Sequence, residues 1–142
     1  MTIGRILEGR TARIVTCEAG LSVTDAIDIL GQHRIGALPV VEAGSVVGIF
    51  SERDVIYKLR ELGPRALALT VRDAMTAPAV TVNVKTGALE ALSLMTSRRI
   101  RHLPVMDAGR MAGFVSIGDI VKYRIDQIHS EAEAMRSYIQ TA

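Results

Sequence analysis

The sequence of 142 residues has no tryptophan, only two phenylalanines and three tyrosines, and a single cysteine, Cys17. Few aromatic rings disfavour single-stranded RNA or DNA as a ligand, because such binders usually stack bases on aromatic side chains. One cysteine excludes an intramolecular disulfide, which is typical of the reducing cytoplasm. The N-terminus lacks the apolar stretch of a signal peptide, and no apolar run approaches the ~20 residues that span a bilayer. We therefore expect a cytoplasmic protein without membrane segments.

An excess of charge of one sign is also missing. Lys and Arg number 17 and Asp and Glu number 15, mixed along the chain, so the formal charge is +2 and no basic stripe favours a polyanion. The histidines, His33, His102 and His129, are too far apart for a metal-binding motif. Cys17 and His102 lack an oxyanion motif or a third partner, and the phosphate loop G-x-x-x-x-G-K-[ST] is missing. These absences predict a non-catalytic protein with no metal and no catalytic cofactor.

The sequence does contain an internal repeat, and its hydrophobic fraction of 49% is typical of a globular core. Residues 16–58 align with residues 81–123 at a constant offset of 65, without a gap. Most identical pairs gather around a Leu-Pro-Val triplet or a Ser-x-x-Asp motif. The twelve pairs are Thr16/Thr81, Ala26/Ala91, Arg34/Arg99, Ile35/Ile100, Leu38/Leu103, Pro39/Pro104, Val40/Val105, Ala43/Ala108, Gly44/Gly109, Gly48/Gly113, Ser51/Ser116 and Asp54/Asp119.

Each copy predicts the element order β-α-β-β-α. In the first copy we expect a short strand near residues 14–16 and then a helix from Val23 to about Arg34, with Ser22 as its N-cap. Two apolar, β-branched runs flank a Glu-Ala-Gly-Ser turn and predict a hairpin, after which a helix runs from Glu52 to about Leu62. The second copy repeats the order, with strands expected at 103–106 and 111–115, helices after Gly87 and from Ile117, and a helical turn over 70–76 before it.

The fold class expected from this order is α/β (α+β). Pro39 and Pro104 lie inside expected strands, where proline removes a ladder hydrogen bond unless it sits at a strand start or a sheet edge. So small a unit buries too little surface to be stable alone. We therefore expect two pseudo-symmetric repeats that share one core. Residues 1–66 would form the first repeat with an N-terminal lead-in helix, and residues 67–142 the second, with a long C-terminal helix over about 117–140.

These features resemble the tandem cystathionine-β-synthase (CBS) domain pair, also called the Bateman module. The resemblance covers nearly the whole chain and is carried by two motifs in each copy: Leu38-Pro39-Val40 with Gly48–Asp54, and Leu103-Pro104-Val105 with Gly113–Asp119. It implies ligand sites in the cleft between the repeats for adenosine compounds such as AMP, ADP, ATP, NAD or S-adenosylmethionine. It also implies a nucleotide-responsive accessory protein rather than an enzyme.

The Ser and Asp of each motif suit a nucleotide. A carboxylate offers only acceptors and a ribose offers two adjacent hydroxyl donors, so Asp54 and Asp119 fit a vicinal diol. Ser51 and Ser116 stand at expected helix N-termini, where free backbone N–H groups favour a phosphate. The alternative is that each Ser is only an N-cap and each Asp only a first-turn acid of its own helix. Their presence in both copies favours the ligand interpretation.

The resemblance also implies that each site draws its Ser-x-x-Asp from one repeat and its base-contacting segment from the other. The base would lie against Ile35-Gly36-Ala37 at one site and Ile100-Arg101-His102 at the other, and residues after Thr16 and Thr81 would close the pockets.

The two implied sites differ in charge. One would join Ser51, Arg53 and Asp54 to Arg99, Arg101 and His102, and the other would join Ser116, Gly118 and Asp119 to Gly36 and Ala37. We expect the Arg-rich site to take NAD, ADP or ATP and the plainer site to take AMP. The alternative is that Arg99 and Arg101 are solvated charges paired with neighbouring acids.

The expected C-terminal helix carries an apolar stripe with alternating spacings of four and three residues, which is a heptad pattern. Its members are Val121, Ile125, Ile128, Ala132, Met135 and Ile139. The stripe could pack on its own module, or it could meet the same helix of a second copy, as the flat dimers of the resembling family imply. We expect a homodimer.

Two other functions are alternatives to a nucleotide sensor that signals to an unknown regulated protein. One is a structural dimerisation or adaptor protein with vestigial pockets, against which the intact Ser and Asp of both repeats argue. The other is RNA or DNA binding through Arg98 and Arg99.

Overall fold

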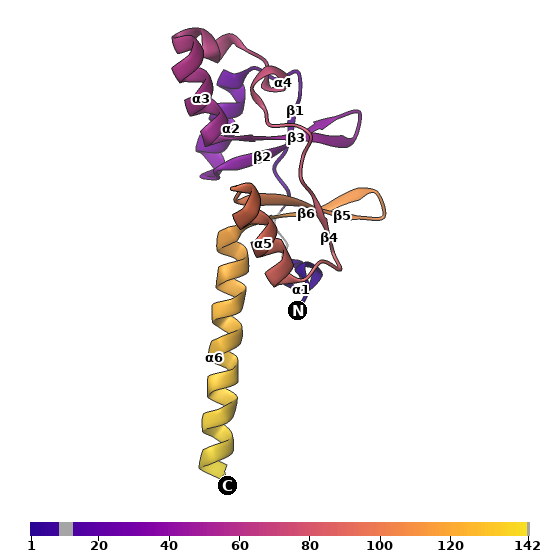
Figure 1. Cartoon of the computed structure of the whole chain (residues 1–142), viewed down its shortest axis with the longest axis vertical. Helices are drawn as coiled ribbons and strands as arrows, with labels where there is room; N and C mark the ends of the chain where they lie inside the picture. Colours follow the sequence, from indigo (N-terminus) through magenta and orange to yellow (C-terminus); the bar gives the residue numbers. More distant parts are fainter. Residues whose placement is uncertain (9–12, 142) are drawn as a thin grey trace.

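The computed structural model describes residues 1–8 and 13–141, and Figure 1 shows two sheets, one above the other, with a long helix leading away from them. Each sheet has three strands, in the orders β1-β2-β3 and β4-β5-β6. The strands are β1 Cys17–Glu18, β2 Ala37–Glu42, β3 Ser45–Ser51, β4 Val82–Asn83, β5 His102–Asp107 and β6 Arg110–Ser116. The helices are α1 Ile3–Leu7, α2 Val23–His33, α3 Glu52–Leu62, the 3-10 helix η1 Gly63–Ala68, α4 Val71–Ala74, α5 Ala88–Arg98 and α6 Ile117–Thr141. The predicted α/β (α+β) fold class is confirmed.

Local capping explains why the helices begin and end where the sequence predicts. The Ser22 hydroxyl accepts a hydrogen bond of 3.1 Å from the Asp25 N–H at the start of α2. The C-cap residues of α2 and α5 are Arg34 and Arg99, and both lie in the left-handed region, with φ of 52° and 54°. Gly63, with φ of 62°, ends α3.

Pro39 costs the first sheet little because of where it lies in β2. Pro39 is opposite Ile49 in the β2–β3 pair, and the Ile49 N–H and C=O bind Thr76 on the outer edge instead. The nitrogen of Pro39 therefore faces away from β3. On that other side β1 pairs only with Val40 and Val41, so no partner strand meets the missing donor.

The first strand begins later than the sequence predicts. We expected it near residues 14–16, but β1 is Cys17–Glu18, because it runs parallel to β2 and pairs with the positions just beyond Pro39. A two-residue parallel strand is set by its partner rather than by its own residues, so its position has no local signal.

The buried residues form two clusters, which corrects the expectation of one shared core. Each sheet packs against its own helices, and each cluster is completed by a segment from elsewhere in the chain. Ile3 and Ile6 of α1 lie in the cluster of the second repeat, and Val71 and Ala74 of α4 lie in that of the first. The packing therefore crosses the expected boundary between residues 1–66 and 67–142, ranges in which residues 9–12 and 142 lie outside the described part.

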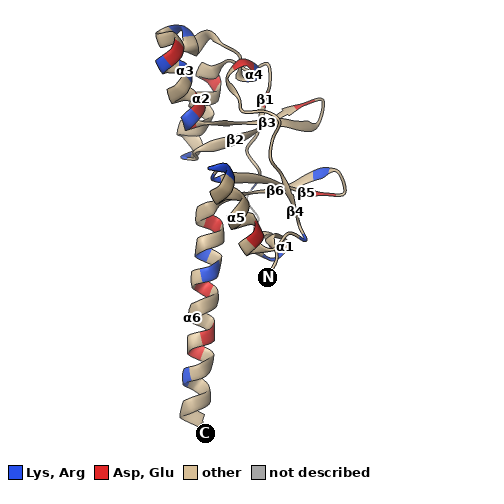
Figure 2. Cartoon of the chain, viewed as in Figure 1, with Lys and Arg blue, Asp and Glu red and all other residues tan. Residues whose placement is uncertain are grey.

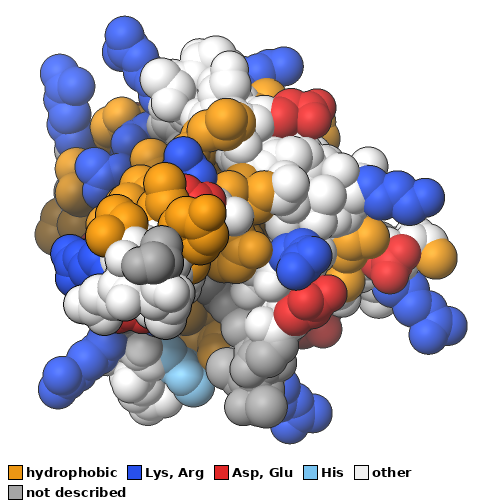
Figure 3. Space-filling model, turned by 90° about the horizontal axis from the view of Figure 1, so that it is seen from below, with side chains coloured by type: hydrophobic (Ala, Val, Ile, Leu, Met, Phe, Trp, Pro, Cys, Tyr) orange, Lys and Arg blue, Asp and Glu red, His pale blue; other side chains and the backbone are white. Residues whose placement is uncertain are grey.

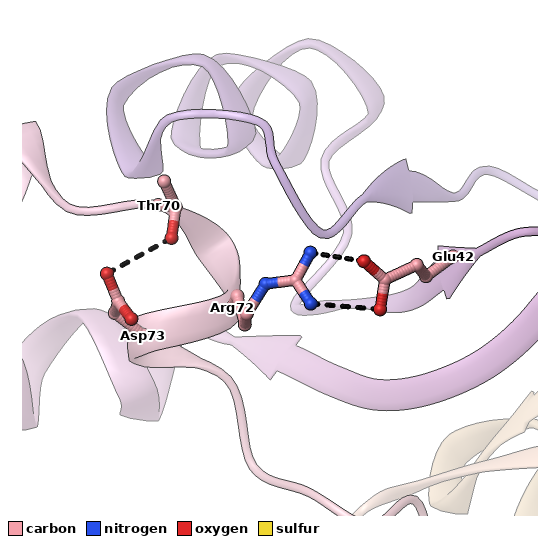
Figure 4. Close-up of polar contacts among 4 residues, drawn as sticks. All are labelled: Glu42, Thr70, Arg72 and Asp73. Carbon is pink, nitrogen blue, oxygen red and sulfur yellow. Dashed lines mark hydrogen bonds and ion pairs between the residues drawn. The ribbon is translucent and has the colours of Figure 1, made fainter.

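Backbone hydrogen bonds and one ion pair hold these crossed segments in place. The Ile3 and Gly4 N–H groups donate to Thr86 and Val84, at 2.8 and 2.9 Å. On the other side, the Val71 N–H donates to Leu21 at 2.8 Å. Figure 4 shows the Arg72 guanidinium of α4 forming two parallel hydrogen bonds with the Glu42 carboxylate at the end of β2. The guanidinium keeps the pKa of Glu42 below its usual value.

Helix α6 has 25 residues, and beyond Ile120 its side chains are largely exposed. Figure 2 shows its acidic and basic residues interspersed along its length. The view along the helix from its C-terminal end shows hydrophobic side chains exposed there as well (Figure 3). No helix in the described part of the chain is both long and apolar enough to cross a membrane.

Candidate functional site

Both Ser-x-x-Asp motifs form the same structure at the start of a helix. In the first, the Asp54 carboxylate accepts from the Ser51 N–H at 2.8 Å, and the Asp54 N–H donates to the Ser51 hydroxyl at 3.4 Å. In the second, the corresponding distances for Asp119 and Ser116 are 2.8 and 3.1 Å. These are capping boxes, so each Ser is an N-cap and each Asp a first-turn acid of its own helix. A capping box and a ligand site are compatible, because a carboxylate has about four acceptor positions.

A cavity of about 470 Å³ lies between the two repeats beside the second motif. Ser116 and Asp119 line it from the second repeat, and Ile35, Gly36 and Ala37 line it from the first, so the structure brings these predicted residues together. Its other lining residues are Leu7, Arg13, Ile14, Val15, Arg34, His102, Ala112, Gly113 and Phe114. We call this space the Asp119 cavity.

The segments around the two repeated threonines are placed differently from the expectation. The Asp119 cavity is lined by Arg13, Ile14 and Val15, which come before Thr16, rather than by residues after it. Thr81 lines a separate hollow with Val82 and Glu90. The reason is the late start of β1, which leaves residues 13–15 outside the sheet and beside the cavity.

The charge contrast predicted from the sequence is corrected in two respects. His102, expected beside Arg99 and Arg101, lines the Asp119 cavity. Arg13 and Arg34 line it too, so the cavity expected to be plain carries two cations and one carboxylate. The guanidinium group of neither arginine has a hydrogen bond or ion pair with another described residue. Because Arg34 is identical to Arg99 in the other repeat, the sequence could have indicated Arg34 as a lining residue. No pattern in the sequence indicates Arg13 as one.

His102 forms part of the cavity wall as a stacked ring. Its imidazole lies against the Phe114 ring with centroids 5.4 Å apart and planes 18° from parallel. Burial lowers the pKa of His102, an effect that Asp119 and Glu52 oppose and Arg101 reinforces. The neutral imidazole is therefore favoured at pH 7.

The first motif has different surroundings. Arg53 at the start of α3 donates from Nη1 to the Arg99 carbonyl at 2.7 Å, so these two predicted residues do meet across the repeats. Asp54 is only 8% exposed, and its second oxygen accepts a hydrogen bond of 2.9 Å from the Thr76 hydroxyl. Arg101 is exposed, and its carbonyl accepts from the Ile117 N–H, while Ile100 packs on the core of the second repeat.

The structure also bears on two other kinds of chemistry, metal binding and nucleophilic attack by Cys17. Among residues 1–8 and 13–141, no three His, Cys, Asp or Glu side chains gather in a way that could hold a metal ion. Cys17 lies in the core of the first repeat, where burial and the nearby Glu18 raise the pKa of its thiol to about 11. The thiolate that a nucleophile requires is thus disfavoured.

Comparisons with known proteins identify the family. The CBS-domain family model matches residues 6–61 and 71–126. The chain is 38% identical over 129 residues to the CBS domain-containing protein CBSX3, mitochondrial, of Arabidopsis thaliana, an alignment that spans 87% of this chain but only 63% of that protein. The chain therefore belongs to the CBS-domain family, and its two matched segments make it a CBS-domain pair.

Solved structures agree with this assignment. The CBS-domain containing protein ATU1752 from Agrobacterium tumefaciens has a TM-score of 0.82 at 36% identity, covering 87% of this chain and 92% of that one. CBSX2, solved in complex with AMP, has a TM-score of 0.74 at 27% identity, covering 88% of this chain and 96% of that one. Relatives with this fold thus include a CBS-domain protein that binds AMP.

Proposed function

We propose that the chain is a non-catalytic regulatory module that binds an adenine nucleotide in the Asp119 cavity and signals energy or redox state to a partner protein. The observation that carries the proposal is the meeting of a carboxylate, a helix N-terminus and two cations in one cavity between the repeats. The complex of CBSX2 with AMP supports the choice of ligand.

Each part of a nucleotide has a suitable neighbour in this cavity. Asp119 offers acceptors to the two ribose hydroxyls, and Ser116 stands where the first N–H groups of the 25-residue helix α6 favour a phosphate. Ile14, Val15 and Ile35 provide apolar surface for a base, next to backbone groups of Gly36 that can read its edge. A volume of about 470 Å³ is within the range of ordinary ligand pockets.

The arginines that line the Asp119 cavity bear on how many phosphates its nucleotide carries. The sequence suggested AMP for this site and NAD, ADP or ATP for the site of Asp54, because Arg53, Arg99 and Arg101 belong to the latter. Arg13 and Arg34 weaken that division. We propose that the Asp119 cavity accepts AMP and also ADP, ATP or NAD, whose additional phosphates would pair with these guanidinium groups.

The test is isothermal titration calorimetry of the purified chain with AMP. Asp119→Asn should weaken binding about 10- to 150-fold, which corresponds to the loss of a hydrogen bond to a charged group worth ~1.5–3 kcal/mol. The matched control is Asp25→Asn, because Asp25 also lies three residues after a capping serine but at the start of α2. Equal AMP affinity in wild type and Asp119→Asn would contradict the assignment.

We also propose that the active form is a homodimer. The stripe residues of α6 are exposed in the single chain, and so is Ile56 of α3, which the offset of 65 aligns with Val121 of the stripe. Exposed apolar residues on a helix favour a partner, and a second copy presents the same surface. The regulated protein is unknown, nucleic acid is not favoured by the mixed surface charge, and the cytoplasmic location stays a prediction.

A further inference from the structure

His102 lies next to the helix N-terminus at which the phosphate of the proposed ligand would bind. In the β5–β6 pair it is directly opposite Ser116, the last residue of β6 before α6 begins. Residues opposite each other on antiparallel strands carry their side chains on the same face of the sheet, with Cβ atoms about 4.5–5.5 Å apart. His102 and Ser116 both line the Asp119 cavity, so a phosphate held at Ser116 would have a titratable ring as its neighbour.

A second contact fixes the imidazole in this place. Phe114 comes two residues before Ser116 on β6, so its side chain lies on the same face of the sheet. The His102 ring stacks on it, with 5.4 Å between centroids, and is half-buried. A ring that turned away from the cavity would lose this stacking contact.

The first repeat has no such group at the matching position. The residue opposite Ser51 in the β2–β3 pair is Ala37, which the offset of 65 aligns with His102. Of the two repeated motifs, the one beside the Asp119 cavity therefore has an ionisable ring opposite its serine, and the other has a methyl group.

The charged residues around the imidazole are of both signs. Asp119 of α6 and Glu52 of α3 favour its protonated form, and Arg101 disfavours it. Burial is the largest influence and lowers the pKa of His102. The neutral ring is therefore favoured at pH 7 in the free chain.

A bound phosphate would change this balance. It would bring negative charge to the cavity wall beside His102 and would also pair with Arg13 and Arg34, which line the same cavity. An opposite charge within about 4–6 Å favours the charged form of an ionisable group. The ligand would also exclude water from the ring, which acts in the other direction, but the ring is already half-buried, so the added charge is the larger change.

We propose that His102 takes up a proton when an anionic nucleotide binds in the Asp119 cavity, so that the chain binds the nucleotide more tightly as the pH falls. This inference rests on the proposed function and adds a second signal to it, because occupancy of the cavity would report pH as well as nucleotide concentration. By linkage, the effect is confined to the pH range between the pKa of His102 in the free chain and its higher pKa in the complex.

The first measurement follows the imidazole of His102 by NMR with and without AMP. The chain has three histidines, and His33→Gln and His129→Gln identify the signals of the two exposed ones, which leaves that of His102. Its titration midpoint should lie below the ordinary value of 6.5 in the free chain and should move up by about one pH unit or more with AMP bound. A midpoint that stays or moves down while AMP is bound would overturn the inference.

Calorimetry with AMP at pH 7.5 and pH 5.5 measures the consequence for affinity. The phosphate of AMP also titrates in this range, so wild type is compared with His102→Gln, which keeps the titration of the ligand. The gain in affinity on going to pH 5.5 should be about 10-fold larger in wild type than in His102→Gln. His129→Gln is the matched control, because His129 is exposed on α6, and it should behave as wild type does.

The results separate the inference from the proposed function. Equal pH dependence in wild type and His102→Gln would overturn the inference and leave the proposed function standing. No AMP binding by wild type at either pH would overturn the proposed function and the inference with it. Should circular dichroism show that His102→Gln does not fold, the NMR titration of wild type decides by itself.

Discussion

His102 is a titratable residue whose protonation the fold changes. It comes from β5, stacks on Phe114 of β6 and lies near Asp119, Glu52 and Arg101. Burial is the largest influence on it and lowers its pKa below the ordinary value of 6.5. The unfolded chain, in which this burial is lost, binds a proton more readily than the folded chain does.

Because of this difference in proton binding, the free energy of unfolding should decrease as the pH falls. Because the folded-state pKa of His102 is lowered, its full contribution is present above about pH 6.5 and is lost as the pH falls below that value. We expect His102→Phe, which keeps an aromatic ring against Phe114, to lose less free energy of unfolding than wild type between pH 7.5 and 5.5. Urea unfolding followed by circular dichroism measures this. An equal loss in both proteins would show that His102 is not responsible.

Single residues also show where prediction from the sequence stops. Ser51, Asp54, Ser116 and Asp119 were identified because a repeated motif has a local chemical meaning. Both capping boxes confirm their place at the helix starts, whereas their role as nucleotide ligands stays a prediction. The partner of Arg53 could not be predicted, since a guanidinium that meets a carbonyl in the other repeat has the same sequence as one that awaits a phosphate.

At the scale of elements, local signals located the helices, the short ones included, and misplaced the first strand. Caps and left-handed end residues fixed α2 and α3, whereas β1 depends on its pairing with Val40 and Val41. The sequence predicted a lead-in helix at the N-terminus and a helical turn over 70–76, and both exist as α1 and α4. Which core each of them joins is decided by contacts far along the chain, so no local pattern reveals it.

The crossed packing of α1 predicts an unusual sensitivity of the N-terminus. Ile3 is fully buried in the core of the second repeat. Ile3→Ala should therefore lower the free energy of unfolding by about 2–5 kcal/mol, as a large-to-small core substitution does. The comparison variant is Leu89→Ala, because Leu89 is 73% exposed and should change little. Chemical unfolding of both variants gives the two values, and similar losses would contradict the packing of α1.

At the scale of the whole molecule, the projecting helix α6 is the feature on which the proposed homodimer rests. The family model ends at residue 126, while α6 continues to Thr141 with its stripe uncovered in the single chain. Figure 1 shows this part of the helix standing clear of both sheets. Packing on its own module, the alternative considered from the sequence, is therefore not how the helix lies in the single chain.

We expect wild type to be a dimer in light scattering coupled to size-exclusion chromatography, and Ile128→Glu with Met135→Glu to be a monomer, because charges in an apolar helix contact lose hydration without a partner. Both side chains are exposed in the single chain, at 49% and 64%, so the monomer should keep its fold. Ser130→Glu with Ser137→Glu adds the same charges off the stripe and should remain dimeric. A dimer in both variants would remove α6 from the interface.

The crossing of α1 and α4 between the two cores has a consequence for how this chain can be divided. A deletion that removed either repeat would also take away part of the remaining repeat's core, Ile3 and Ile6 in one case and Val71 and Ala74 in the other. A single repeat cut out at the expected boundary would therefore lack part of its own core. The pair is the smallest unit of this chain in which both cores are complete.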